Sequence, residues 1–297
     1  MSKYNTQKIE YPEYKTYLKN LQLLSNFDFT NYTNEQIYNK FHDLALTIPG
    51  LGAKLIHEKI NGFELYRVRM ESSISELEDK DIIQTFSFPP PAVLNSNGRA
   101  NIKNKSVFYC TDHPYPAIKE ANGEIDEVGF LGIWEIQASR DLVYLSCLPE
   151  VLPNLNNWHE FGEFHYNFLI EKQSDEDSKV LPHKIALRKL ITDKFMLEKP
   201  QYHISSMIAN EYLYKNDCDL LLYPSAQSFQ DYINFAFHPN VVLSHLKCKK
   251  IVRFKISKIT NQQVGFNLLG IGEIENDRIK WRKTTDQDGL DLGFRKE

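Results

Sequence analysis

The N-terminal part of the chain carries apolar side chains at the spacing of amphipathic helices. Thr33-Asn34-Glu35-Gln36 has the form of a capping box, in which side chains satisfy the first free N–H groups of a helix. Apolar residues follow at helical spacing up to Ile48, and Pro49-Gly50 ends the pattern. We therefore predict that residues 1–62 form a helical N-terminal extension that packs onto the rest of the chain.

A different pattern begins at Phe63. From Phe63 to Met70 the side chains alternate, which places Tyr66 and Val68 on one face of a strand and Arg67 and Arg69 on the other. The arginine face fits two interpretations, a solvated surface or a site for an anionic ligand. The strand alone favours the surface.

Shorter elements are predicted further along the chain. Phe86 to Pro91 is expected to be extended, because each proline disfavours helix in the residue before it. Pro114 and Pro116 open a short helix that ends at Asn122-Gly123. The predicted strands are Ser106–Thr111, Gly129–Gln137, Leu142–Leu145, Leu220–Tyr223, one from Lys249 onward with a single wet face, and a closing hairpin of Gln263–Ile274 and Arg278–Trp281.

The region 145–200 is less regular. Its acidic segment Ser174–Ser178 is predicted to be a loop, and helices are predicted over Ile185–Phe195 and Ile204–Lys215. The final residues are expected to form a mobile tail. Together these elements predict an α+β fold, with a mixed, mostly antiparallel set of short strands around a cleft and helices packed outside.

Composition narrows the class of protein. Of 297 residues, 42% are apolar and 25% charged, and the net charge of −4 argues against an extended nucleic-acid surface. Met1 to Glu13 is polar, and no apolar run reaches the length of a membrane helix, so we expect a cytoplasmic protein without membrane contact. Four widely spaced cysteines are expected to be reduced thiols in or near the core: Cys110, Cys147, Cys218 and Cys248.

Two tempting motifs lack the required spacing. Gly50-Leu51-Gly52 follows a predicted helix and has no third glycine, so it is interpreted as a loop and not as a dinucleotide fingerprint. His159 and His165 are six residues apart, whereas a zincin motif needs two histidines at i and i+4. His159 and Glu163 could share a helix face, but we expect no metal site.

Candidate chemistry gathers between Asn97 and Glu120. This stretch combines a Gly-Arg turn, a strand with Tyr109 and a short helix carrying Glu120. An arginine, an aromatic ring and a carboxylate suit a ligand that contains phosphate and ribose. Arg67 could add a second arginine, and Ser225, at the end of a buried strand, a hydroxyl group. Taken one at a time, each residue also has an ordinary structural interpretation.

In order along the chain, these segments resemble the RES domain family, which is named after a recurring Arg, Glu and Ser. The resemblance covers about 63–240, so we interpret 63–297 as a RES-like catalytic domain with an insertion at about 145–200. The turn departs from the family pattern: it is Asn-Gly-Arg-Ala-Asn here and usually Gly-Gly-Arg-Trp-Asn in the family. The segments are Tyr66-Arg67-Val68, Gly98-Arg99, Val107-Phe108-Tyr109, Ala117-Ile118-Lys119-Glu120, Tyr223-Pro224-Ser225 and Asn234-Phe235-Ala236-Phe237.

The resemblance implies a fold like that of mono-ADP-ribosyltransferases and an activity that destroys NAD. Many such domains are toxins of bacterial toxin–antitoxin pairs, silenced by an antitoxin with a helix-turn-helix domain. The resemblance implies an NAD phosphorylase or an NAD glycohydrolase that uses no metal. Inorganic phosphate is a candidate co-substrate, and a second copy of the chain is a candidate partner. Two alternatives remain: an ADP-ribosyltransferase that modifies a macromolecule, and a nucleotide-binding module without turnover.

The resemblance also assigns roles to residues. Arg67 and Arg99 would bind the diphosphate or the attacking phosphate, and Tyr109 would stack on nicotinamide or fix its ribose. Glu120 would accept a hydrogen bond from a ribose hydroxyl and stabilise the cationic transition state. Ser225 would bind ribose or phosphate, or steady Arg67. The catalytic set is thus Arg67, Glu120 and Ser225, and the binding set adds Gly98, Arg99, Tyr109 and Asn234.

Overall fold

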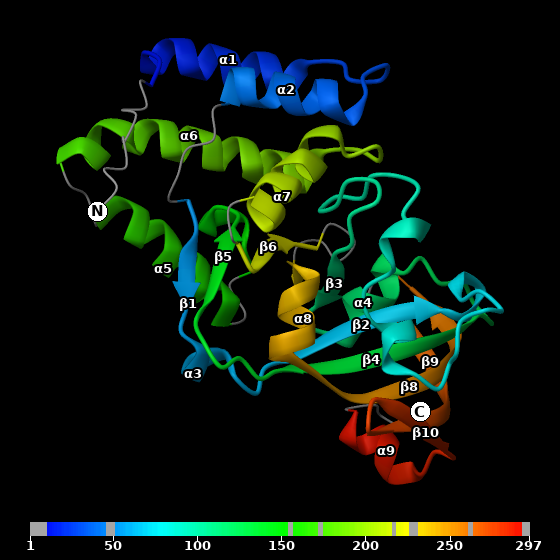
Figure 1. Ribbon diagram of the computed structural model, residues 1–297. Coiled ribbons are helices and arrows are strands. Elements are labelled where there is room, and N and C mark those ends of the chain that lie inside the picture. Colours follow the sequence, from blue (N-terminus) through cyan, green and yellow to red (C-terminus); the bar gives the residue numbers. More distant parts are fainter. Residues whose placement is uncertain are drawn as a thin grey trace, which may run out of the picture.

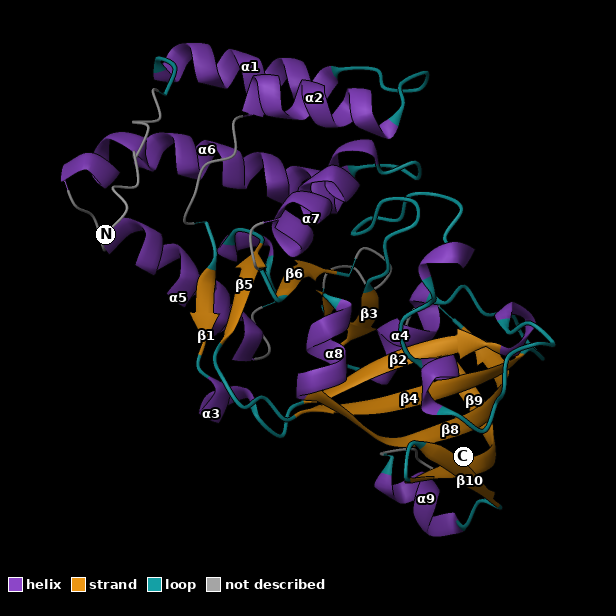
Figure 2. Ribbon diagram, viewed as in Figure 1, coloured by secondary structure: helices purple, strands orange, loops and turns teal. Residues whose placement is uncertain are grey.

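The computed structural model describes residues 11–45, 51–153, 157–171, 175–215, 218–225, 231–260 and 264–292. These residues form a mixed α+β structure built on one ten-stranded sheet (Figures 1 and 2). The strand order is β1-β5-β6-β7-β3-β2-β4-β8-β9-β10. Every pairing is antiparallel except that of β5 with β6. The predicted fold class, a mostly antiparallel α+β architecture, is confirmed.

The strands cover most of the predicted segments. Their bounds are β1 (Ala53–Leu55), β2 (Glu64–Met70), β3 (Phe108–Thr111), β4 (Val128–Ile136), β5 (Leu142–Ser146), β6 (Leu220–Pro224), β7 (Ile233–Phe237), β8 (Leu246–Ile259), β9 (Val264–Glu275) and β10 (Arg278–Arg282). Two strands were not predicted, β1 and β7. The three residues of β1 lie between loops and carry no periodic signal. The segment of β7 was noted only as an apolar run that resembles the family.

The helices lie outside the sheet. Their bounds are α1 (Tyr14–Asn26), α2 (Asn34–Ala45), α3 (His57–Ile60), α4 (Pro114–Glu120), α5 (Asn157–Glu171), α6 (Asp175–Leu197), α7 (His203–Lys215), α8 (Pro239–His245) and α9 (Asp286–Asp291). Figure 1 shows α1 and α2 stacked on α6 and α7 at one end of the molecule, and the contacts between these helices agree. No helix among the described residues is long and apolar enough to cross a membrane.

The capping box of α2 is confirmed. The Thr33 N–H donates to the Gln36 side-chain oxygen at 2.9 Å, and the Gln36 N–H donates to the Thr33 hydroxyl at 3.3 Å. Each side chain thus satisfies the backbone of the other. The predicted stop at Pro49-Gly50 lies outside the described residues.

Three local predictions need correction. The acidic segment predicted as a loop contains the start of α6 at Asp175, so the helix is longer than its apolar pattern and includes Pro182. Part of the expected tail is α9, which Thr285 and Asp288 begin with a second capping box. The Phe86–Pro91 segment is extended at Ser87 and Pro90, as predicted, but Phe86 ends the short 3-10 helix Ile83–Phe86 and Pro91 begins another, Pro91–Val93.

The core lies between the sheet and its helices. One large apolar cluster joins residues of α1 and α2 to residues of the central strands, and a smaller one lies under β2, β4, β8 and β9. All four cysteines are buried and free, as predicted. The large cluster contains both Tyr17 from α1 and Phe237 from β7, and both are buried. The N-terminal helices therefore share one core with the sheet.

Candidate functional site

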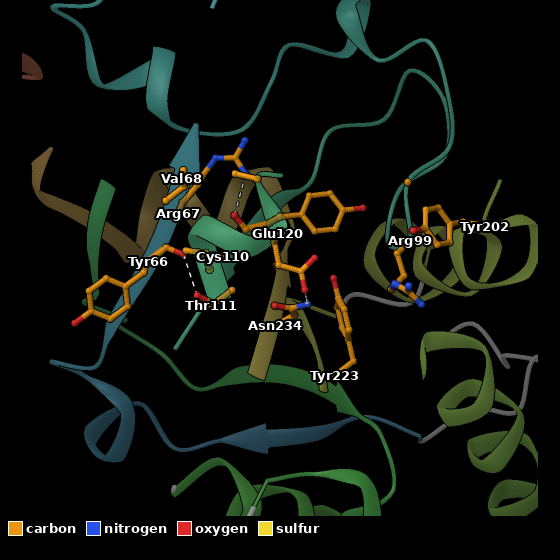
Figure 3. Close-up of a pocket in the computed structure, with 14 residues that line it drawn as sticks. Tyr66, Arg67, Val68, Arg99, Cys110, Thr111, Glu120, Tyr202, Tyr223 and Asn234 are labelled. Carbon is orange, nitrogen blue, oxygen red and sulfur yellow. Dashed lines mark hydrogen bonds between the residues drawn. The ribbon is translucent and has the colours of Figure 1, made fainter. Parts of the chain in front are cut away.

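One pocket collects most of the residues singled out in the sequence. Its volume is about 320 Å³, and residues from β2, β3, α4, β6 and β7 line it together with the turn at Gly98 (Figure 3). The lining includes Arg67, Gly98, Arg99, Tyr109, Glu120 and Asn234. Strands that are distant in sequence but adjacent in the order β6-β7-β3-β2 bring these side chains together.

Glu120 lies at the end of α4 with its carboxylate held by two donors. The Ser225 hydroxyl donates to Oε1 at 2.7 Å, and the Asn234 amide donates to the same oxygen at 2.9 Å. Both donors are buried. Ser225 follows β6 and Asn234 lies near the start of β7, so the antiparallel pairing of these strands brings the two residues to the same edge of the pocket. The arrangement fixes the direction in which the carboxylate faces the pocket.

Arg67 is partly exposed to the pocket, yet its Nε atom is buried and has no hydrogen-bond partner. Its Nη1 donates to the Tyr109 carbonyl at 2.8 Å, and its guanidinium lies 5.5 Å from the centre of the Phe108 ring. Burial lowers the pKa of Arg67 to about 10, and no carboxylate pairs with it among the described residues. The solvated-face interpretation of this arginine is therefore wrong.

Arg69, on the same face of β2, has a different environment. Its guanidinium donates to both carboxylate oxygens of Glu78, at 2.6 and 2.8 Å, and also to the carbonyls of Thr85 and Ser73. Of the two arginines on this strand, Arg69 is neutralised within the protein, whereas Arg67 remains available to an anionic ligand.

The turn before Arg99 is closed by Tyr109. The Tyr109 hydroxyl accepts from the Ala100 N–H and donates to the Asn101 side-chain oxygen, both at 2.8 Å. Burial raises the pKa of Tyr109, so its hydroxyl keeps its proton. This hydroxyl therefore holds the turn, while the rest of the side chain lines the pocket. A tyrosine from β3 thus anchors the turn that contains Ala100.

Asn97, the first residue of the turn, pairs with the N-terminal helix α2. The amides of Asn97 and Asn34 donate to each other, at 3.1 and 3.2 Å. Asn97 does not have a positive φ, so its position does not require glycine. The N-terminal helix α2 thus contacts the turn that carries Arg99.

Arg99 lies on the opposite side of the pocket from Arg67 in Figure 3, with Glu120 between them. Its Nη1 donates to the Phe195 carbonyl at 2.5 Å, and its guanidinium lies 4.8 Å from the centre of the Tyr202 ring. Phe195 belongs to α6 and Tyr202 to the turn before α7. The insertion predicted at about 145–200 and the turn that follows it therefore support this wall of the pocket.

Sequence reasoning missed Tyr202 as a pocket residue. Gln201 and Tyr202 both have positive φ values, of 104° and 44°, a conformation that non-glycine residues seldom adopt. The Glu198 carboxylate accepts from the N–H groups of Ile204 and Ser205 and so caps the start of α7. No local pattern marks Tyr202, because its partner Arg99 lies about a hundred residues earlier in the sequence.

Gly98 is required by the close approach within the turn. A Cβ atom there would overlap Asn101 Oδ1 and lie 3.0 Å from the Tyr109 hydroxyl. We expect Gly98→Ala to lower the free energy of unfolding by about 1–3 kcal/mol, because Asn101 must leave its bond with Tyr109. Urea denaturation would measure the change. Gly289→Ala, where a Cβ meets open space, is the matched control and should cause no loss.

Potential metal ligands lie elsewhere. His159 and Glu163 lie 3.4 Å apart on α5 and form a pair only. Among the described residues, one group of three possible ligands lies close together, the partly exposed His57, exposed Glu58 and partly exposed Asp141. None of these residues lines the pocket around Glu120.

No protein-family model matches the chain, and a search of curated proteins finds no relative.

Proposed function

We propose that this protein is a RES-type enzyme that consumes NAD by breaking the bond between nicotinamide and ribose. The observation that carries the proposal is the carboxylate of Glu120, which Ser225 and Asn234 orient in a pocket flanked by Arg67 and Arg99. A fixed negative charge between two cations matches a substrate whose ribose becomes cationic and whose diphosphate is anionic.

The chemistry divides among these residues. Nicotinamide leaves as a neutral group because its ring is cationic in NAD, so no general acid has to protonate it. Glu120 stabilises the positive charge that develops on ribose and accepts a hydrogen bond from a ribose hydroxyl. Arg67 and Arg99 bind the diphosphate, or the attacking phosphate if the reaction is phosphorolysis.

Ser225 has an orienting role in this scheme. Its hydroxyl donates to Glu120, and no hydrogen bond among the described residues joins it to a histidine that would activate it as a nucleophile. Ser225 therefore holds Glu120 and not Arg67. Asn234 does the same from the neighbouring strand.

The proposal extends to the fold relationship and to the role of the protein in the cell. The fold would be related to that of ADP-ribosyltransferases, and the protein would be a bacterial, cytoplasmic toxin held inactive by an antitoxin with a helix-turn-helix domain. The mostly antiparallel sheet and the order of the site residues along the chain support this interpretation.

The decisive experiment incubates the purified protein with NAD, with and without inorganic phosphate, and follows free nicotinamide by chromatography. Release that requires phosphate identifies a phosphorylase, and release without it a glycohydrolase. NAD labelled in its ADP-ribose part separates these from a macromolecular ADP-ribosyltransferase, which would leave label on protein or nucleic acid. A folded protein that binds NAD and leaves it intact in both conditions would contradict the proposal and favour a binding module.

A further inference from the structure

A second cavity lies on the other side of Arg67. Its volume is about 390 Å³, and it shares Arg67, Val68 and Ala121 with the pocket around Glu120. The two cavities therefore meet along β2 and the end of α4. Residues that line only the second cavity include Ser72, Ser73, Ser87, Pro89, Asn122 and Glu127.

Arg67 is the charged group at this junction. In Figure 3 its guanidinium points away from the carboxylate of Glu120. Its Nε is buried without a partner, and it has no carboxylate among the described residues. A guanidinium that no carboxylate neutralises, at the meeting point of two cavities, suits an anion that spans both of them.

The second cavity offers further groups that suit a nucleotide. The Glu127 carboxylate accepts from the Ser72 hydroxyl and from the Glu124 N–H, the latter at 3.1 Å, and is partly exposed. A carboxylate can accept hydrogen bonds from the two hydroxyls of a ribose. Pro89 adds apolar surface of the kind that lines sites for flat rings.

We propose that the second cavity binds the adenylate half of NAD, while the diphosphate crosses at Arg67 and the nicotinamide ribose faces Glu120. The inference rests on the proposed function, because it assigns the two halves of that substrate to two cavities. Glu127 binds the adenosine ribose, and the surface around Pro89 contacts the base. The enzyme thereby selects a dinucleotide over a mononucleotide.

The test fills the second cavity and leaves the first unchanged. Ser72 is exposed at the cavity, so Ser72→Trp blocks it with little effect on the core. Leu77→Trp is the matched control, because Leu77 is 98% exposed and does not line either cavity. Glu127→Gln keeps the size of the side chain and removes its charge. Thermal melts check that each variant folds.

Binding of AMP is measured by calorimetry, and cleavage is measured on NAD and on nicotinamide mononucleotide, which lacks the adenylate half. We expect Ser72→Trp to weaken AMP binding by about tenfold or more and to raise KM for NAD with kcat unchanged. Glu127→Gln should also weaken AMP binding. Cleavage of the mononucleotide, and all properties of Leu77→Trp, should match those of the wild type.

The outcomes separate this inference from the proposed reaction. AMP that fails to bind the wild type, or that binds Ser72→Trp equally well, overturns the adenylate site. If AMP binding is lost in Ser72→Trp while the wild type leaves NAD intact, the adenylate site stands and the proposed reaction fails. If NAD is cleaved with the same KM in Ser72→Trp and wild type, the reaction stands and the adenylate site fails.

Discussion

Glu120→Gln is expected to lower kcat for NAD cleavage by about 100-fold or more. The substitution removes the negative charge that faces the cationic ribose but retains an oxygen that can accept from Ser225 and Asn234. The fold and the binding of the diphosphate should therefore change little. Initial rates of nicotinamide release, measured over a range of NAD concentrations, separate kcat from KM.

The control for this prediction is Glu124→Gln. Glu124 is an exposed glutamate four residues after Glu120, and it does not line the pocket. Its variant should keep wild-type rates. In cells, Glu120→Gln should also relieve any growth inhibition caused by the wild type. A Glu120→Gln variant with near-normal kcat would remove Glu120 from the catalytic set.

Arg67→Met is expected to make the protein more stable and less active. The guanidinium is partly desolvated, its buried Nε has no hydrogen-bond partner and no carboxylate pairs with it among the described residues, so replacing it with an apolar side chain removes a desolvation penalty. We expect the free energy of unfolding to rise by about 1–2 kcal/mol, after the loss of the bond to the Tyr109 carbonyl. KM for NAD should rise strongly, because the diphosphate loses its partner.

Arg69→Met provides a control of opposite sign. Arg69 forms a two-point ion pair with Glu78, so its removal leaves a partly buried carboxylate and two carbonyls without a donor. This variant should be less stable than the wild type by about 1–3 kcal/mol. Urea denaturation of both variants measures the contrast. Equal destabilisation of the two would show that Arg67 is a structural residue.

Periodicity in the sequence was sufficient to predict much of the sheet. Alternation over Phe63–Met70 predicted β2 and the shared face of Arg67 and Arg69, because a strand places every second side chain on the same side. It could not show which arginine is neutralised. Glu78, which pairs with Arg69, follows in an irregular segment whose path depends on tertiary packing.

The candidate site was predictable as a group of residues but not as a geometry. The order of the motifs indicated that Arg67, Glu120 and Ser225 belong together, and the pocket contains or adjoins all three. Their hydrogen bonds depend on the pairing of β6 with β7, which joins segments that local patterns treat separately. Tyr202 was missed for the same reason: its place beside Arg99 depends on a turn with unusual backbone angles.

The reciprocal amide pair between Asn34 and Asn97 has a thermodynamic consequence. The turn that carries Arg99 contacts helix α2 on one side and the pocket on the other. A ligand that holds this turn in its observed conformation thereby favours the docked position of α2. Linkage is reciprocal, so the docked helix must strengthen the binding of that ligand by the same free energy. Binding of a ligand in the pocket and docking of the N-terminal helices are then coupled, and a change in either one shifts the other.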